Sequence, residues 1–427
     1  MRLAGAAFAI VVLLGTTPCR AGELSDVLRS LQNLSPWNSL SGSLRSSYWS
    51  SSRTLDDREH LAAAALWLKA APQLGPHAAL FVEGWVINQQ LFRERETVGE
   101  LREAYVDVSL SSLDLRLGKQ IIAWGQADRI NPTDNLTPRN FTRLFTEDDE
   151  QRLGTVALKA TYYFCGLALT GIWLPDFESD TIPITRPPPS FRLHEREPGQ
   201  PLSQGALKLG RTGTAVDWSV SYFDGFDLFP DLGIERVGPA GVDLLLRNHR
   251  VRVIGTDATT TLGRYGLRGE AAYTFTADSR GNDPAVKNPF FFLVVGGDRT
   301  FFTYLNVNLQ YLFRAVVNFH SPFRIHDPRQ RAVAIQQAVQ TNQLDRTQHG
   351  ISLRVSHKWL NETLEAEVVG VFAFTRGGYV LRPKLSYALT DRWTVVIGAD
   401  VFRGPRPSFF DNLRKNSTAY TELRWSF

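Results

Sequence analysis

The sequence predicts an all-β protein, a closed antiparallel β-barrel that crosses a membrane with its strands. From about Ser41 onward, apolar and polar residues alternate with the period of two that is typical of β-strands. The polar face of these segments carries many charges, as the wet interior of a membrane barrel does. The last segment, Ala419–Phe427, ends on an aromatic residue. We expect about 16 strands, within roughly 14 to 18, because bacterial barrels keep an even number.

Residues 1–21 have the features of a secretory signal peptide. Arg2 supplies the positive start, an apolar run too short to span a bilayer follows, and Ala21 precedes the expected cleavage point. Residues 22–36 are expected to form a short amphipathic helix, either a docked leader or a plug in the barrel mouth. Its apolar positions are Leu24, Val27, Leu28, Leu31 and Leu34. Residues 37–427 would then form the barrel.

Composition argues against several classes of protein. The formal net charge is only +4, whereas a nucleic-acid-binding protein needs a concentrated basic face, so no nucleic-acid partner is expected. Cys165 is the only cysteine after the signal peptide, so no intramolecular disulfide can form. No later stretch reaches the roughly 18 uninterrupted apolar residues of a transmembrane helix.

Enzyme motifs are also missing from the sequence. It contains no His-Glu-x-x-His pair, no Gly-x-Ser-x-Gly elbow and no phosphate loop. Ser356 and His357 are neighbours on a predicted strand, so they face opposite sides and cannot form a nucleophile–base pair. The acidic run Asp148–Glu150 is more typical of a solvated loop than of a cation site. We therefore expect no enzymatic activity, no cofactor and no metal.

The alternation assigns strand faces. The clearest segment runs from Leu305 to Phe313. In the last strand, the pattern places Leu423, Trp425 and Phe427 toward lipid, where they would support barrel closure against the first strand near residues 41–48. The opposite, charged face is expected to line the lumen. It carries Asp107, Lys159, Asp217, Arg268, Glu270, Arg354, Glu365, Glu367, Arg382, Lys384, Glu422 and Arg424.

The expected connections differ in length, as in membrane barrels with short turns at one end and long loops at the other. Short turns are predicted at Asn361-Glu362 and at residues 376–378. Long loops are predicted at about residues 126–151, 176–204, 225–248, 278–287, 321–348 and 404–415. The loop 176–204, with three consecutive prolines at 187–189, is predicted to have no regular structure. Residues 330–344 are predicted to contain a short helix.

The densest stretch of unusual residues runs from Gly118 to Gly154. Strict alternation places Lys119 toward lipid, where a charge is costly. Either Gly118 forms a bulge that reverses the alternation, or Lys119 lies near the interface and extends its charge to water. We favour the bulge, because glycine is a common bulge residue.

The loop 126–151 is rich in both charge signs and in Pro and Asn. One interpretation is a loop that folds inward, constricts the pore and screens solutes; the other is an ordinary surface loop with internal salt bridges. We favour the constriction. The candidates for pore lining and selectivity are Lys119, Arg129, Asp134, Arg139, Arg143 and Arg152.

Several residues in this stretch resemble a known pattern. Gly118-Lys119-Gln120, Trp124-Gly125, an Asn-Pro-x-Asp segment ending at Asp134, and Arg152 are similar to the shared run of an uncharacterised family of porin-like outer-membrane barrels, often discussed beside RND-type exporters. Alginate-export barrels are a more distant resemblance. Lys119 stands where that pattern usually has Arg, so bidentate anion binding would be lost. The resemblance covers about residues 107–154 and implies an outer-membrane barrel with a passage role.

Together these features predict a channel in the outer membrane of a Gram-negative bacterium, exported by its signal peptide, that passes or helps export a solute. Expected partners are outer-membrane lipid, the barrel assembly machinery and a periplasmic or inner-membrane exporter component. The alternative is a structural barrel of an export or electron-transfer assembly, without channel activity of its own. A barrel hydrolase and a soluble secreted β-protein rank below these two.

Overall fold

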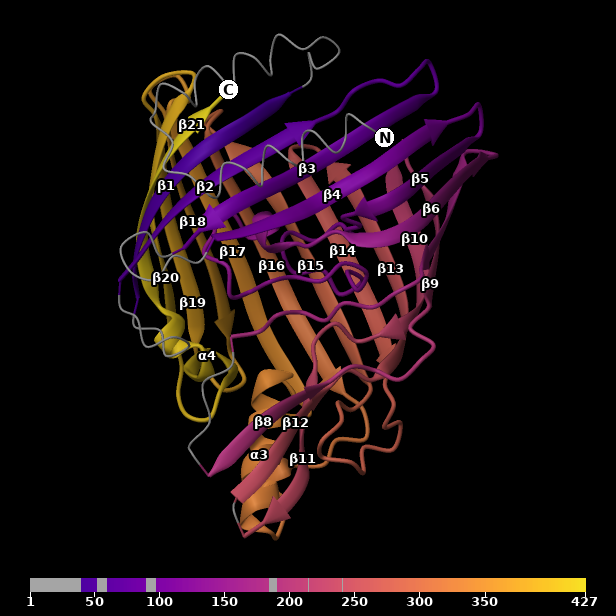
Figure 1. Ribbon diagram of the computed structural model, residues 1–427, viewed down its shortest axis with the longest axis vertical. Helices are drawn as coiled ribbons and strands as arrows, with labels where there is room; N and C mark the ends of the chain where they lie inside the picture. Colours follow the sequence, from indigo (N-terminus) through magenta and orange to yellow (C-terminus); the bar gives the residue numbers. More distant parts are fainter. Residues whose placement is uncertain (1–39, 52–59, 90–96, 184–189, 214, 240) are drawn as a thin grey trace.

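Eighteen strands form one antiparallel sheet that closes into a barrel (Figure 1). The computed structural model describes residues 40–51, 60–89, 97–183, 190–213, 215–239 and 241–427. The predicted signal peptide and the predicted helix at residues 22–36 lie outside this part of the chain. The barrel closes where β21 pairs with β1, from Ser43 opposite Ser426 to Ser51 opposite Thr418. The all-β barrel is therefore confirmed, and its strand number falls within the expected range.

The strands alternate in direction around the wall. The barrel strands are β1 Ser41–Ser51, β2 His60–Ala70, β3 Ala78–Asn88, β4 Thr97–Ser109, β5 Leu113–Gln120, β6 Thr155–Phe164, β7 Leu167–Leu174, β9 Gln204–Arg211, β10 Val216–Phe226, β13 Arg250–Leu262, β14 Tyr265–Phe275, β15 Phe290–Phe301, β16 Leu305–Val316, β17 Thr347–Trp359, β18 Leu364–Ala373, β19 Tyr379–Ala388, β20 Trp393–Arg403 and β21 Thr418–Ser426. The strands outside the barrel are β8 Phe191–Arg196, β11 Asp231–Gly238 and β12 Gly241–Arg247. The helical segments are η1 Asp148–Gln151, η2 Pro322–Arg324, α3 Pro328–Gln340, α4 Phe409–Asn412 and η3 Arg414–Asn416.

The two ends of the barrel differ, as the sequence predicts. Turns such as residues 110–112, 165–166 and 263–264 connect strands at one end, the short-turn end, where β21 also ends. The six predicted long loops all lie at the other end, the long-loop end. The predicted turn at Asn361-Glu362 lies at the short-turn end. The predicted turn at residues 376–378, in contrast, lies at the long-loop end. It connects β18 to β19, whereas the turn at residues 361–362 connects β17 to β18.

The last strand has the predicted orientation. Glu422 is buried in the interior, whereas Leu423 is exposed on the outside. The Arg424 guanidinium donates a hydrogen bond to Thr146, a residue of the loop inside the barrel. Phe427 extends the pairing with β1, because its backbone N–H and C=O both bond to Gly42. The terminal aromatic residue is thus part of the ladder that closes the barrel.

The bulge expected at Gly118 is wrong. β5 pairs in continuous register with β4 and β6, so the alternation is kept: Leu117 is exposed, and Lys119 on the same face lies opposite the exposed Val156. Lys119 is therefore on the outward face, one residue before the end of β5 at the long-loop end. Gly118 is needed for another reason. Its φ is +134°, and a Cβ there would lie 2.3 Å from the Ala104 carbonyl oxygen.

The irregularity lies on the neighbouring strand instead. The pairing of β3 with β4 shifts between Glu83 and Gly84, which leaves Arg102 without a partner in the ladder. Arg102 and Glu103 then both point inward, toward Glu83 and the Ile121 N–H respectively. A bulge re-aims a side chain in this way.

A small appendage projects from the long-loop end (Figure 1). β12 pairs antiparallel with β11 and parallel with β8. One face of this sheet packs on α3 through an apolar cluster of Leu232, Val242, Leu244, Leu246 and Val333. The helix predicted within residues 330–344 is therefore confirmed. The prediction that loop 176–204 has no regular structure is wrong, because β8 forms once β12 supplies a partner.

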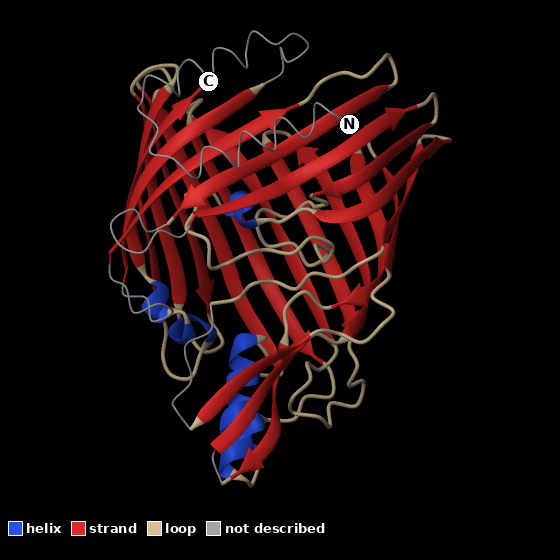
Figure 2. Cartoon of the chain, in the orientation of Figure 1, coloured by secondary structure: helices blue, strands red, loops and turns tan. Residues whose placement is uncertain are grey.

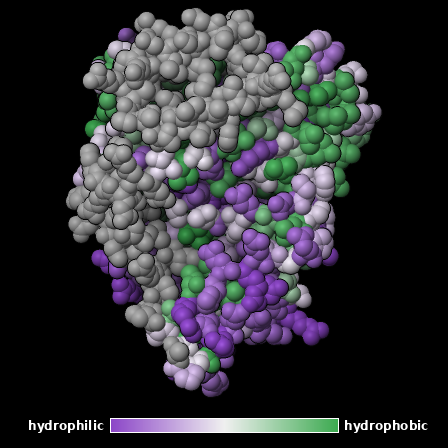
Figure 3. All heavy atoms as spheres, in the orientation of Figure 1, coloured by the Kyte–Doolittle hydropathy of each residue, from purple (hydrophilic) through white to green (hydrophobic). Residues whose placement is uncertain are grey.

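The barrel wall has an apolar exterior and a crowded interior. On the face shown in Figure 3, hydrophobic residues cover the wall at the right of the view, and hydrophilic residues gather toward the long-loop end. Within the described residues, no helix combines the length and apolar character needed to cross a membrane. The interior is occupied by loop segments and a short helical turn (Figure 2).

Candidate functional site: the lumen loop

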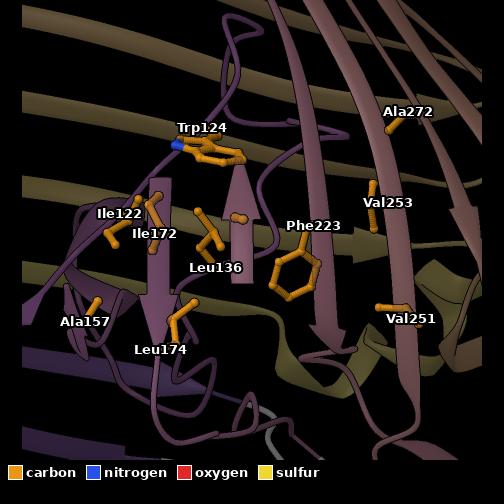
Figure 4. Packing of buried hydrophobic residues seen from close by; sticks show 11 residues of the cluster. Ile122, Trp124, Leu136, Ala157, Ile172, Leu174, Phe223, Val251, Val253 and Ala272 are labelled. Atoms are coloured by element: carbon orange, nitrogen blue, oxygen red, sulfur yellow. The ribbon is translucent and has the colours of Figure 1, made fainter. Parts of the chain in front are cut away.

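The connection between β5 and β6, residues 121–154, folds into the barrel; we call it the lumen loop. Its first part packs against the wall formed by β6, β7, β9, β10, β13 and β14. Figure 4 shows Ile122, Trp124 and Leu136 beside wall residues of this cluster. Farther along the loop, Leu144 packs with Trp49 and Tyr420, and Phe145 packs with Trp67 and Trp85. The lumen loop therefore reaches opposite sides of the interior.

Glu270 of β14 anchors the first part of the lumen loop. The carboxylate is 1% exposed and accepts the backbone N–H groups of Gln126 and Ala127 at 3.0 and 3.1 Å. It also accepts the backbone N–H and the hydroxyl of Thr133, both at 2.7 Å, and the Asn131 amide at 3.2 Å. A buried carboxylate is stable only when its oxygens are well bonded, and these five bonds meet that need.

Gly125 allows the backbone of the lumen loop to lie close to the Glu270 carboxylate. Its φ is +100°, and a Cβ there would lie 2.4 Å from Glu270 Oε2 and 2.6 Å from Asn131 Nδ2. A side chain at this position would push the carboxylate away from the loop. The motif residues Gly125 and Asn131 therefore dock the loop on β14.

The turn that follows reaches β16, β17 and β18. Asp128 and Gln310 bond reciprocally, because the Asp128 N–H donates to Gln310 Oε1 and Gln310 Nε2 donates to the Asp128 carbonyl oxygen. Arg354 Nε donates to the Asp128 carboxylate at 2.7 Å. Arg129 has a positive φ of 66° and lies 3.0 Å from Glu367. These contacts extend the attachment along the wall from β14 to the nearby strands β16, β17 and β18.

The acidic part of the lumen loop faces a basic wall. Glu147 pairs with Lys384 at 2.9 Å, Glu150 pairs with Arg45 at 2.7 Å, and Asp148 lies between Arg129 and Arg382. We call this set the ionic clasp. It joins the loop to β1 and β19.

Two carboxyl groups of the clasp differ in pKa. Burial opposes ionisation of Asp148, but Arg382 and Arg129 outweigh it and lower its pKa below the ordinary value. Burial raises the pKa of Glu150, and Arg45 and Arg424 only partly offset it. Both groups bind cationic side chains, which argues against the hard-cation interpretation of the run 148–150.

A second ionic group stabilises the loop internally. Asp134 accepts from Arg152 at 2.5 Å and from Arg139 at 3.4 Å, and the side chains of Asp134 and Arg152 are both 8% exposed. Asp134 also accepts the Trp124 N–H at 3.4 Å. Asp180 from the next long loop accepts the Arg139 N–H at 2.7 Å. These bonds close the loop into one compact unit.

The six candidate selectivity residues occupy three different environments. Lys119 faces outward and is not part of the lumen. Asp134 and Arg152 are largely buried and bond to each other. Arg129, Arg139 and Arg143 line an interior cavity, which Arg152 also borders, and Arg143 lies over the Trp85 ring at 5.2 Å. Their role in selectivity stays a prediction.

Several residues that bind the lumen loop are not among those candidates. They are wall residues, and the sequence signal that points to them is a charged or amide side chain on the lumen face of a strand. They are Arg45, Arg102, Glu270, Gln310, Arg354, Glu367, Arg382, Lys384 and Arg424.

Several cavities are lined by residues of the lumen loop, and two of them adjoin Gln126 and Ala127. One, of about 730 Å³, is lined by residues 127–131, by Glu147, Asp148 and Arg382 of the clasp, and by lumen residues of β17 to β20. The other, of about 440 Å³, is lined by Gln126 and by lumen residues of β9, β10 and β13 such as Lys208 and Asp257. The two linings share no residue, and they meet at the adjacent residues Gln126 and Ala127, whose N–H groups Glu270 holds.

Comparison with known proteins supports the fold. No protein-family profile and no curated protein matches this chain. Among solved structures, OccK5 (OpdH) of Pseudomonas aeruginosa matches with a TM-score of 0.53 and 12% identity, over 91% of this chain and 97% of its own. OccAB3 of Acinetobacter baumannii gives 0.55 and 9%, over 91% and 98%. The outer membrane protein opdK of P. aeruginosa gives 0.53 and 9%, over 91% and 98%.

These similarities concern the fold, which is a barrel of the porin kind. At 9–12% identity they do not test the role of any residue. The resemblance to the barrels discussed beside RND-type exporters, and to alginate-export barrels, stays a prediction.

Proposed function

We propose that this protein is a porin-like channel of the outer membrane of a Gram-negative bacterium, with the lumen loop as its constriction. The observation that carries the proposal is the loop itself, which bonds to Glu270 on one side of the lumen and to the ionic clasp on the other. A loop attached at both sides would narrow the interior, and a solute would have to pass it.

Passage would be passive. Polar lumen faces of the strands keep the interior wet, and the loop narrows the route between the two cavities. Most charges near the loop already pair with each other. Arg143 is the lumen candidate with no direct ion pair in the described part of the chain, although its charge acts on the nearby Glu100 carboxyl, so it is the first choice for a charge that a solute meets. The expected surroundings are outer-membrane lipid and, during biogenesis, the barrel assembly machinery.

A second function is favoured by the same loop. If the lumen loop stays bound both to Glu270 and to the ionic clasp, the barrel conducts little alone and serves as a structural element of an export assembly. The short-turn end, which faces the periplasm in barrels of this kind, would then be the contact surface. This alternative predicts co-purification with a periplasmic or inner-membrane exporter component.

Conductance in planar bilayers tests the proposal. Folded wild-type protein should give discrete channels, and Arg143→Glu should change their ion selectivity toward cations. The control is Arg211→Glu, which changes the same charge on the outer wall at the short-turn end of β9. Folding is verified for each variant by the heat-dependent shift in gel mobility. A folded protein without channels, or equal selectivity of the three proteins, would overturn the proposal.

A further inference from the structure

Two arginines face outward on β13, at the long-loop end of the barrel. Arg250 and Arg252 alternate with Val251 and Val253, which are buried in the interior cluster. Arg250 Nε donates to Asp224 at 2.6 Å, and Arg252 Nε donates to the other oxygen of the same carboxylate at 3.1 Å. Two guanidinium groups therefore share one carboxylate, and the group keeps a positive charge.

These arginines keep donors for another ligand. The side chain of Arg252 is 67% exposed, and its two terminal nitrogens have no partner in the described part of the chain. Arg250 is 45% exposed and has one weak further bond, from Nη1 to the Ser203 carbonyl oxygen at 3.4 Å. A guanidinium presents paired N–H groups that fit the oxygens of a phosphate. On the outer wall of a barrel, arginine is tolerated near the interface rather than at the membrane midplane.

An apolar furrow of about 490 Å³ begins beside these arginines. Around the wall, Asp224 lies opposite Gly205, which lies opposite Trp173. In the next row toward the short-turn end, Tyr222 lies opposite Leu207, which lies opposite Gly171. The furrow is lined by Leu158, Ala160, Gly171, Ile172, Trp173, Gly205, Ala206, Leu207, Tyr222 and Asp224.

The furrow exists because two wall positions have no side chain. A Cβ at Gly171 would lie 3.7 Å from Leu207 Cδ2, and a Cβ at Gly205 would lie 3.9 Å from the Ile172 carbonyl oxygen. Both are ordinary van der Waals distances, so packing does not require glycine at either position. Trp173 and Tyr222 border the hollow, and aromatic residues of this kind mark the level of a membrane interface.

We propose that this surface binds an anionic lipid. Its phosphate would lie on Arg250 and Arg252, and one acyl chain would follow the furrow past Gly205 and Gly171 toward the middle of the wall. Charge complementarity identifies the headgroup, and the apolar lining identifies the chain. The site is separate from the lumen and needs only that the wall faces lipid.

Native mass spectrometry of the folded full chain in detergent tests this. The probes are dimyristoyl phosphatidic acid and dimyristoyl phosphatidylcholine, which have the same acyl chains but differ in headgroup charge. Wild-type protein should retain the anionic lipid about tenfold more than the zwitterionic one. Arg250→Gln/Arg252→Gln should lose that preference, and Arg211→Gln, which removes an outward arginine at the opposite end of the wall, should keep it. Equal retention of the two lipids by wild-type protein would overturn the proposal, whatever the variants show.

Two further arms separate a lipid from a free anion. Gly171→Leu fills the furrow and should lower retention of phosphatidic acid while leaving the arginines in place. Inorganic phosphate at millimolar concentration should compete poorly. If inorganic phosphate displaces the lipid fully, or if Gly171→Leu retains it as wild type does, the site binds phosphate alone and the lipid proposal fails. Channel conductance plays no part in these readouts, so their failure leaves the proposed channel function standing.

Discussion

Replacement of Glu270 by alanine would detach the first part of the lumen loop from the wall. The carboxylate accepts five hydrogen bonds, from Gln126, Ala127, Asn131 and twice from Thr133. Each buried donor left unpaired costs about 1–3 kcal/mol, and the terms are not additive because they share one acceptor group. We therefore expect a loss of about 4 kcal/mol in loop docking, or about a thousandfold in the ratio of docked to undocked loop.

Hydrogen exchange measures this ratio directly. The amides of Gln126, Ala127 and Thr133 should lose protection by two to three orders of magnitude, roughly the docking energy converted to a ratio. Amides of β14 that bond within the wall should keep theirs, because the ladder does not depend on the Glu270 side chain. In bilayers, the same variant should show larger and noisier current steps than wild-type protein.

Two variants serve as controls. Glu270→Gln keeps one acceptor oxygen but turns an NH₂ group toward N–H donors, so its loss of protection should fall between those of wild type and alanine. Glu365→Gln changes another lumen-facing carboxylate, one without a bond to the lumen loop in the described part of the chain, and should have no effect. Unchanged protection at residues 126, 127 and 133 in a folded Glu270→Ala protein would refute the assignment of Glu270 as the anchor.

Three further outcomes are expected. Gly125→Ala should also undock the loop, because its Cβ would lie 2.4 Å from Glu270 Oε2; wild-type exchange at residue 126 would contradict this. Burial raises the pKa of Asp180 from 3.8 to about 6, with Asp227 adding to the rise and the Arg139 N–H opposing it. The folded state therefore holds this proton more tightly, so stability falls by at most about 3 kcal/mol as the pH rises from 4 to 7. Asp180→Asn should match wild type in melting temperature at pH 4 and exceed it at pH 7; the same difference at both pH values would exclude this origin. Deletion of Phe427 should impair assembly into the membrane while secretion continues, and normal membrane levels of heat-modifiable protein would disprove its role.

The wall could be predicted from the sequence because a strand records its environment locally. Each lumen residue has lipid-facing neighbours one position away, so the faces of Glu422 and Leu423 follow from the alternation alone. Closure of β21 on β1 also follows, since a barrel has no free edge. The exact strand number cannot be predicted in this way, because the alternating pattern of short strands such as β5 and β7 is hard to separate from the loops that flank them.

The attachment of the lumen loop could not be predicted, because its partners come from distant strands. Glu270 meets Gln126 only after the barrel closes, and nothing near residue 126 specifies an acidic partner 144 positions away. The predicted position of the bulge was wrong for a related reason. Gly118 carries a local signal for unusual backbone, and its positive φ confirms that signal. Whether the ladder shifts there or at Arg102 depends on how two strands pair, which is not a property of either strand alone.

The residues that make the sequence resemble porin-like barrels are concerned with docking the loop rather than with contacting a solute. Gly118 allows close strand approach, Gly125 makes room for Glu270, and Asp134 binds Arg152 inside the loop. Charges that neutralise each other at 2.5 Å leave little field for a passing ion. Selectivity should therefore depend on cavity residues without a direct ion pair, of which Arg143 is the candidate in the described part of the chain. Reversal of Arg143 should change ion selectivity directly, with a loss of stability limited to its contact with the Trp85 ring and to repulsion from Glu100, whereas Asp134→Asn should lower the stability of the loop and alter selectivity only through its movement.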